Sequence, residues 1–116
     1  MTQANGSEET VTQWLAQQRA AMLALIEKLV NTDGGSYDKA GVDAVGVHLR
    51  SFLEGEGIAC EVIPNETFGD ALRATVPGGA AGSANSGIVL MGHRDTVFPK
   101  GEPTRRPFRI EGDRAY

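Results

Sequence analysis

The feature that most constrains the fold is a short apolar run, residues 88–91, which follows Gly87 and ends in the string Gly-His-Arg-Asp. Apolar residues without an intervening polar position predict a strand buried on both faces, as in a parallel sheet. Open α/β sheets build their binding sites beyond the carboxyl ends of such strands. His93 and Asp95 are therefore expected at the edge of a functional site.

The pairing of a histidine with an aspartate two residues later predicts a metal site. A neutral imidazole is a common zinc ligand, and a nearby carboxylate can fix its tautomer and raise its basicity. We therefore take His93 as a candidate metal ligand and Asp95 as the candidate catalytic-site acid that supports it. The alternative is a hydrogen-bonded loop histidine, because His-x-Asp alone is a common tripeptide.

Two helices are predicted before this run. Apolar side chains, Trp14 among them, recur at spacings of three, four and seven over residues 7–30 and indicate one amphipathic helix with Trp14 in the core. A second helix is predicted from residue 37 or 38 to residue 56, where Gly57 ends it.

Residues 59–64 and 71–76 are predicted as strands, and the turn residues between them indicate a β-hairpin. Residues 77–87 are rich in glycine and predict a surface loop rather than a phosphate site, because they lead into another strand. Helices followed by strands predict an α/β fold class, with a layered α/β/α arrangement around a mixed sheet.

Composition limits the function classes. With 116 residues one domain is expected, and a net charge of −4 argues against a nucleic-acid partner. No stretch approaches the roughly 18 apolar residues of a membrane-spanning helix, and the first residues lack a signal-peptide pattern, so the cytoplasm is the expected compartment. Cys60 is the single cysteine and is expected to pack as a small hydrophobe.

Basic residues gather late in the chain, and two interpretations are open. They form a solvated face, or Arg105 and Arg106 attract an acidic substrate. The set comprises Arg94, Lys100, Arg105, Arg106, Arg109 and Arg114.

The longer string around His93 resembles a known signature. Residues 89–99, Val-Leu-Met-Gly-His-Arg-Asp-Thr-Val-Phe-Pro, are similar to the first metal-binding motif of the M20 family of zinc hydrolases. Residues 107–116 resemble the strand that follows in the glutamate carboxypeptidase (G2-like) branch of that family. The two segments occur in the family's order.

The resemblance implies a site with two zinc ions, in which His93 is a ligand and Asp95 holds and polarises its imidazole. It implies hydrolysis of an amide bond next to a free carboxylate in a small peptide or N-acyl amino acid. A carboxypeptidase for glutamate-type substrates is the leading expectation. The alternatives are an N-acyl amino acid deacylase of the acetylornithine or succinyl-diaminopimelate kind, a non-catalytic binding module with the same fold, and an unrelated α/β interaction domain. The link that contains Ser36, Tyr37 and Asp38 lies near the site in relatives, but no role is assigned to it.

Members of that family are several times longer than this chain. The resemblance therefore implies that residues 1–116 form the N-terminal part of the catalytic domain, without the second half of the site and the lid or dimerisation domain. On that basis the chain alone is expected to be inactive and to self-associate, and the complete enzyme is expected to be a homodimer.

Overall fold

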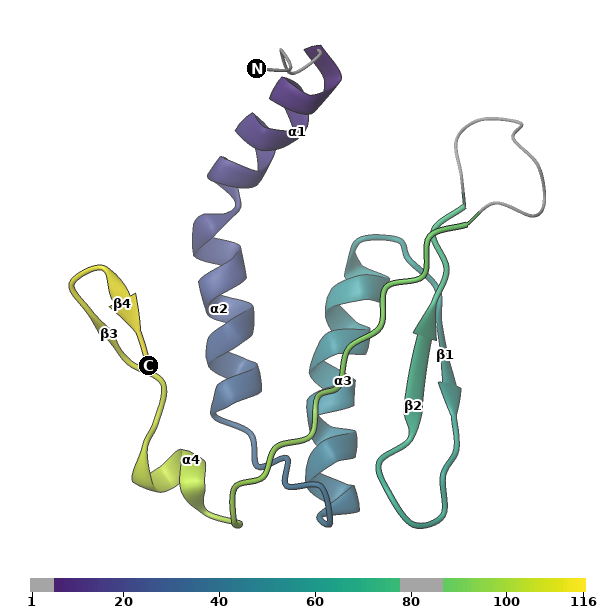
Figure 1. Cartoon of the computed structure of the whole chain (residues 1–116), viewed down its shortest axis with the longest axis vertical. Coiled ribbons are helices and arrows are strands. Elements are labelled where there is room, and N and C mark those ends of the chain that lie inside the picture. Colours follow the sequence, from purple (N-terminus) through teal and green to yellow (C-terminus); the bar gives the residue numbers. More distant parts are fainter. Residues whose placement is uncertain (1–5, 78–86) are drawn as a thin grey trace.

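The computed structural model describes residues 6–77 and 87–116. The chain is α/β, as predicted, with helices and small antiparallel sheets arranged in an open shape (Figure 1). Its elements are α1 (Gly6–Gln17), α2 (Arg19–Val30), α3 (Lys39–Gly55), β1 (Cys60–Ile63), β2 (Ala71–Ala74), α4 (Glu102–Arg105), β3 (Ile110–Glu111) and β4 (Arg114–Ala115).

The first predicted helix is divided in two at Gln18. Gln18 still donates to the carbonyl of Leu15 at 3.0 Å, and α1 bends away from the direction of α2 after this break (Figure 1). No residue of α1 is buried, and Trp14 is 54% exposed. The prediction of Trp14 as a core residue is therefore wrong, because α1 extends beyond the elements that could cover it.

Helix α3 is the best anchored element and agrees with the predicted second helix. Asp38 caps its amino end by accepting a hydrogen bond from the backbone of Gly41 at 3.1 Å. Gly57, with a φ of 77°, follows its carboxyl end. Val42 and Val45 of this helix are the buried hydrophobic residues of the described chain, at 5% exposure each.

The predicted hairpin is confirmed. Strands β1 and β2 pair antiparallel, from Cys60 opposite Ala74 to Ile63 opposite Ala71. In the connecting turn, the Asn65 side chain accepts hydrogen bonds from the backbone of Thr67 and Phe68. The hairpin packs against α3, which in turn contacts α2.

The apolar run does not form the buried strand that its composition predicts. Ile88, Val89, Leu90 and Met91 are 81–92% exposed, and the segment passes beside α3 without a strand partner among the described residues (Figure 1). A strand buried on both faces needs neighbours on both edges and a layer on each face. The described residues form instead two separate two-stranded sheets. The predicted loop before this run lies largely outside the described residues.

The segment after the run folds back on itself. Residues 107–116, predicted as one strand, form the short hairpin of β3 and β4. Gly112, with a φ of 63°, supplies the positive φ that a two-residue hairpin turn requires. No helix in the described part of the chain is long and apolar enough to cross a membrane.

The packing of the hairpin turn on α3 leaves no room for a side chain at Gly69. A Cβ there would lie 2.2 Å from Cγ1 of Val42, which is buried. We expect Gly69→Ala to lower the free energy of unfolding by about 1–3 kcal/mol through overpacking. Gly55→Ala is the matched control, since a Cβ at Gly55 meets nothing within 4 Å. Urea unfolding followed by circular dichroism measures both, and equal midpoints for the two variants would contradict this packing.

Candidate functional site

The segment that carries His93 and Asp95 is fixed to the link before α3. The Thr96 amide donates to the carbonyl of Gly34 at 2.7 Å, and the Ser36 amide donates to the carbonyl of Thr96 at 2.9 Å. These two bonds form a parallel β-bridge between Gly35 and Thr96. The bridge brings residues some 60 positions apart into contact, and it places Ser36 beside Asp95.

His93 and Asp95 contact each other, as their spacing predicts. Nδ1 of His93 lies 3.0 Å from the backbone oxygen of Asp95 and 3.2 Å from its Oδ1. Both neighbours are acceptors, so Nδ1 carries the hydrogen in the neutral ring. The lone pair of Nε2 is then free, and the His93 side chain is 86% exposed. This tautomer presents one nitrogen that can bind a metal.

Ser36 completes a short chain of side chains. Its hydroxyl donates to Oδ2 of Asp95 at 2.6 Å and lies 3.1 Å from the carbonyl of Thr96. The hydrogen bond from Ser36 is the main cause that lowers the pKa of Asp95 below its ordinary value. Asp95 is therefore ionised at neutral pH, and its Oδ1 is suited to accept a hydrogen bond from Nδ1 of His93. The family resemblance placed Ser36 near the site, but the sequence contains no signal for its contact with Asp95.

The residues present fit a zinc site in part. A neutral imidazole whose second nitrogen is held by a carboxylate is a frequent arrangement of a zinc ligand. Zinc sites use three or four protein ligands, and the described residues contain no group of three or more His, Cys, Asp or Glu that could hold a metal. His93 can thus supply one ligand, and its role as a ligand stays a prediction.

A shallow pocket of about 410 Å³ adjoins His93. The hairpin turn and the link before α3 form its walls, and the rings of Tyr37 and Phe68 lie 6.1 Å apart at a tilt of 51°. A small ligand next to His93 would meet both an apolar wall and the polar groups of residues 92–95.

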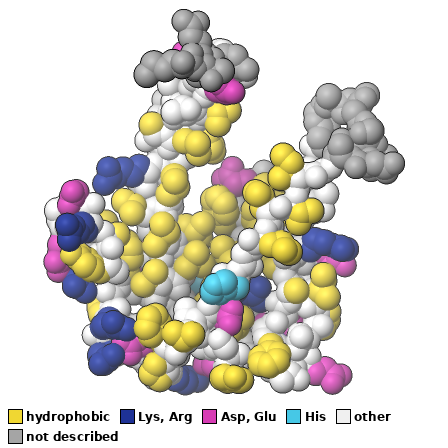
Figure 2. All heavy atoms as spheres, viewed as in Figure 1, with side chains coloured by type: hydrophobic (Ala, Val, Ile, Leu, Met, Phe, Trp, Pro, Cys, Tyr) yellow, Lys and Arg dark blue, Asp and Glu magenta, His cyan; other side chains and the backbone are white. Residues whose placement is uncertain are grey.

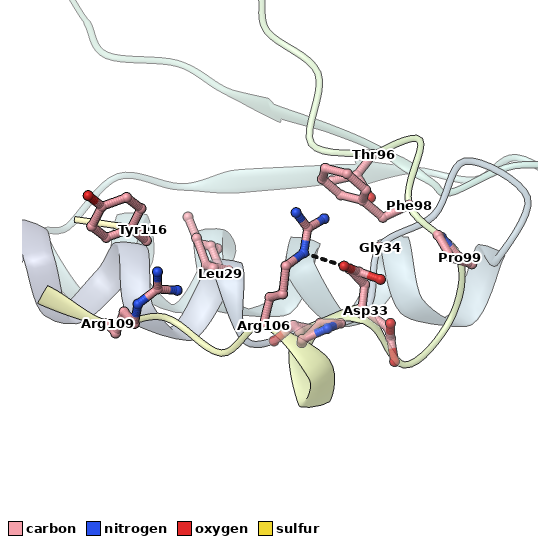
Figure 3. Close-up of a pocket in the computed structure, with 13 residues that line it drawn as sticks. Leu29, Asp33, Gly34, Thr96, Phe98, Pro99, Arg106, Arg109 and Tyr116 are labelled. Carbon is pink, nitrogen blue, oxygen red and sulfur yellow. Dashed lines mark hydrogen bonds and ion pairs between the residues drawn. The ribbon is translucent and has the colours of Figure 1, made fainter. Parts of the chain in front are cut away.

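A second pocket, of about 470 Å³, lies between α2, α4 and the last hairpin (Figure 3). The guanidinium of Arg106 lies 5.0 Å from the Phe98 ring centre, and that of Arg109 lies 4.4 Å from the Tyr116 ring centre. Glu102, which is 8% exposed, pairs with Arg106 and with Arg105, the latter at 2.7 Å. These pairs lower the pKa of Glu102, and Arg105 is the largest cause.

The pairing with Glu102 bears on the two interpretations of the late basic residues. Arg105 and Arg106 share one carboxylate, and Arg109 pairs with Glu111 at 2.7 Å. Cations already paired with carboxylates have less potential left for an acidic substrate. Arg105 and Arg106 together still carry one net positive charge beside Glu102, so their attraction of an acidic substrate stays a prediction.

The chain is similar in sequence to a known peptidase. No family model matches the chain. Over 109 residues, which are 94% of the chain, it is 32% identical to carboxypeptidase G2 from Pseudomonas sp. (strain RS-16). The aligned region is 26% of the length of that protein, so the chain spans about a quarter of its relative. The chain is thus a distant, partial relative of a peptidase.

Proposed function

We propose that this chain forms part of a zinc-dependent hydrolase of the M20 type, with His93 as one metal ligand. The observation that carries the proposal is the hydrogen bonding of His93, whose Nδ1 is held by Asp95 while Nε2 remains free. The similarity to carboxypeptidase G2 over nearly the whole chain supports it. Residues 1–116 would then be the N-terminal part of the catalytic domain.

The residues of this chain have three distinct tasks in the proposed mechanism. His93 offers Nε2 to the metal, Asp95 accepts a hydrogen bond from Nδ1 and so stabilises the Nδ1–H tautomer, and Ser36 keeps Asp95 ionised and oriented. When bound, zinc lowers the pKa of a coordinated water and polarises the carbonyl that the water attacks. We propose two zinc ions, with the further ligands and the general base supplied by residues other than those described.

The proposed substrate is a small peptide or N-acyl amino acid with a free carboxylate next to the scissile amide bond. A glutamate-type residue is preferred in this proposal because residues 89–99 and 107–116 resemble the glutamate carboxypeptidase (G2-like) branch. We further propose that the complete enzyme is a homodimer.

The test begins with the gene, which is sequenced past the codon for Tyr116, and the complete reading frame is expressed. Hydrolysis of an N-acyl glutamate is measured before and after removal of metal by a chelator. We expect the rate to fall to background without metal and to return when about two zinc ions per chain are restored. N-acetylornithine and N-succinyl-diaminopimelate are tested in parallel, and a preference for either would assign the enzyme to the deacylases. Full activity in a sample shown by elemental analysis to be free of metal would refute the proposal.

A further inference from the structure

Arg94 stands between His93 and Asp95 in the sequence, but its surroundings differ from theirs. The side chains of His93 and Asp95 are 86% and 40% exposed, whereas that of Arg94 is 18% exposed. Alternate residues of an extended segment face opposite sides. Arg94 therefore contacts α3 while its neighbours contact each other and Ser36.

The guanidinium of Arg94 joins two elements that are distant in the sequence. Its Nε donates to the carbonyl of Val42 in α3 at 3.0 Å, and a terminal nitrogen donates to the carbonyl of Asp70 before β2. The same terminal group lies 3.9 Å from Oδ1 of Asp43. The rigid fork of a guanidinium suits such simultaneous contacts, because its donors have fixed directions.

Lys39, Asp43 and Asp70 form a network of charged groups next to Arg94. Lys39 bridges Asp43 at 2.9 Å and Asp70 at 2.6 Å, and the Asp70 amide donates to Asp43 at 2.7 Å. Hydrogen bonds from Lys39 are the largest cause that lowers the pKa of both aspartates. Two carboxylates and one ammonium leave one negative charge, which the guanidinium of Arg94 balances.

Helix α3 also leaves space for the guanidinium. A Cβ at Gly46 would lie 3.2 Å from Nε and from Cζ of Arg94, closer than ordinary van der Waals contact. Gly46 is buried in the middle of α3, where glycine is unfavourable for the helix. The glycine thus permits the close approach of Arg94 to the helix backbone.

Besides the bridge at Thr96 and the hydrogen bond from Ser36 to Asp95, the backbone around His93 has little support. Among the described residues, no backbone-to-backbone hydrogen bond involves residues 87–95, and the first one after them is at Thr96. The side chain of Arg94 is therefore the main attachment of this segment to α3 and to the hairpin turn.

We propose that Arg94 is a positioning residue, which anchors the segment on α3 and the hairpin turn so that His93, Asp95 and Ser36 align. The importance of this alignment for a metal rests on the proposed function, but the anchoring itself does not. The effect of Arg94 on His93 is indirect, since no contact joins the two side chains.

The test reads the tautomer of His93 in the metal-free chain, labelled with ¹⁵N at its two histidines. At a pH where the rings are neutral, long-range ¹H–¹⁵N spectra distinguish the Nδ1–H form from the Nε2–H form. We expect the Nδ1–H form to dominate in the parent chain. Arg94→Met should lower the ratio of the two forms by about tenfold, because the bond to Asp95 is no longer held in place.

Controls separate positioning from stability. Arg73→Met removes an exposed ion pair with Glu61 and should leave the His93 tautomer unchanged. The signals of His48 should stay the same in every variant. Arg94→Lys keeps the charge but not the fork, so a partial return of the Nδ1–H form is expected. The cross-strand contacts of β1 and β2 show whether the Arg94→Met chain is folded. If it is folded and keeps the tautomer ratio of the parent chain, the proposal is overturned.

If Arg94→Met does not fold, a second pair of variants tests whether the contact of Arg94 with α3 sets the tautomer of His93. Gly46→Val fills the space that the guanidinium occupies, and Gly55→Val makes the same change in α3 where a Cβ meets nothing. Loss of the Nδ1–H preference in the first variant alone supports the proposal, and equal ratios in both refute it. Since no zinc is present, the result is independent of the hydrolase proposal, which fails separately if the complete enzyme shows no metal-dependent hydrolysis.

Discussion

For the zinc hydrolase proposed above, replacing His93 with alanine is expected to lower the rate of hydrolysis by about three orders of magnitude. A catalytic metal ion contributes several kcal/mol of transition-state stabilisation in enzymes that use one, and each 1.36 kcal/mol corresponds to a factor of about ten in rate. The side chain of His93 is 86% exposed, so its removal should change the free energy of unfolding by less than about 0.5 kcal/mol. The loss of rate would therefore report on chemistry rather than on folding.

Two further variants serve as comparisons for the expected loss of rate. Asp95→Asn keeps an acceptor near Nδ1 of His93 but removes its charge, and changes of this kind cost about 10–100-fold in metal affinity or activity. His48→Ala, in α3, is the matched histidine control and should keep the parent kcat/KM. Bound zinc is measured by elemental analysis in the same samples. A His93→Ala enzyme with a rate within tenfold of the parent would exclude His93 as an essential ligand.

The elements that the sequence predicts correctly are those fixed by local signals. Helix α3 has a capping aspartate at Asp38 and a glycine with positive φ at Gly57, and its apolar stripe contains the buried Val42 and Val45. The hairpin likewise follows from turn residues between two short strands. Each signal acts over a few residues, so periodicity and turn chemistry suffice.

The errors occur where burial depends on distant partners. The run at residues 88–91 has the composition of a central strand, but composition does not supply the neighbouring strands. Trp14 repeats at helical spacing on α1, yet the described chain has nothing that covers it. Periodicity indicates which face a residue belongs to and not whether another element lies against that face.

In the candidate site, too, the sequence predicts local contacts but not contacts between distant residues. The contact between His93 and Asp95 follows from a spacing of two residues, so the sequence could predict it. Ser36 lies 59 residues from Asp95, and Val42 lies 52 residues from Arg94. Such contacts arise from tertiary pairing, and a single sequence gives no signal for them. The structural use of Arg94 was missed for this reason.

The chain is expected to self-associate at micromolar concentrations, because it exposes far more surface than a folded protein of its size. Its accessible surface is 9519 Å², whereas a compact monomer of 12.3 kDa exposes about 6,100 Å². Figure 2 shows hydrophobic side chains spread over much of the face that contains α1 and α2. The run at residues 88–91 adds an apolar segment whose backbone groups have no backbone partner among the described residues, which favours pairing with another chain.

Sedimentation velocity over a wide concentration range measures this association. Leu90 is 92% exposed, and burying one leucine contributes about 1.5–3 kcal/mol, so Leu90→Lys should weaken association by about tenfold or more. Val97→Lys is the matched control, since Val97 is 91% exposed but lies beyond the bridge at Thr96. A difference between the two variants would locate the contact at the apolar run, because their added charge is the same. A parent chain that sediments as a monomer throughout would show that the exposed run finds no partner in a second copy.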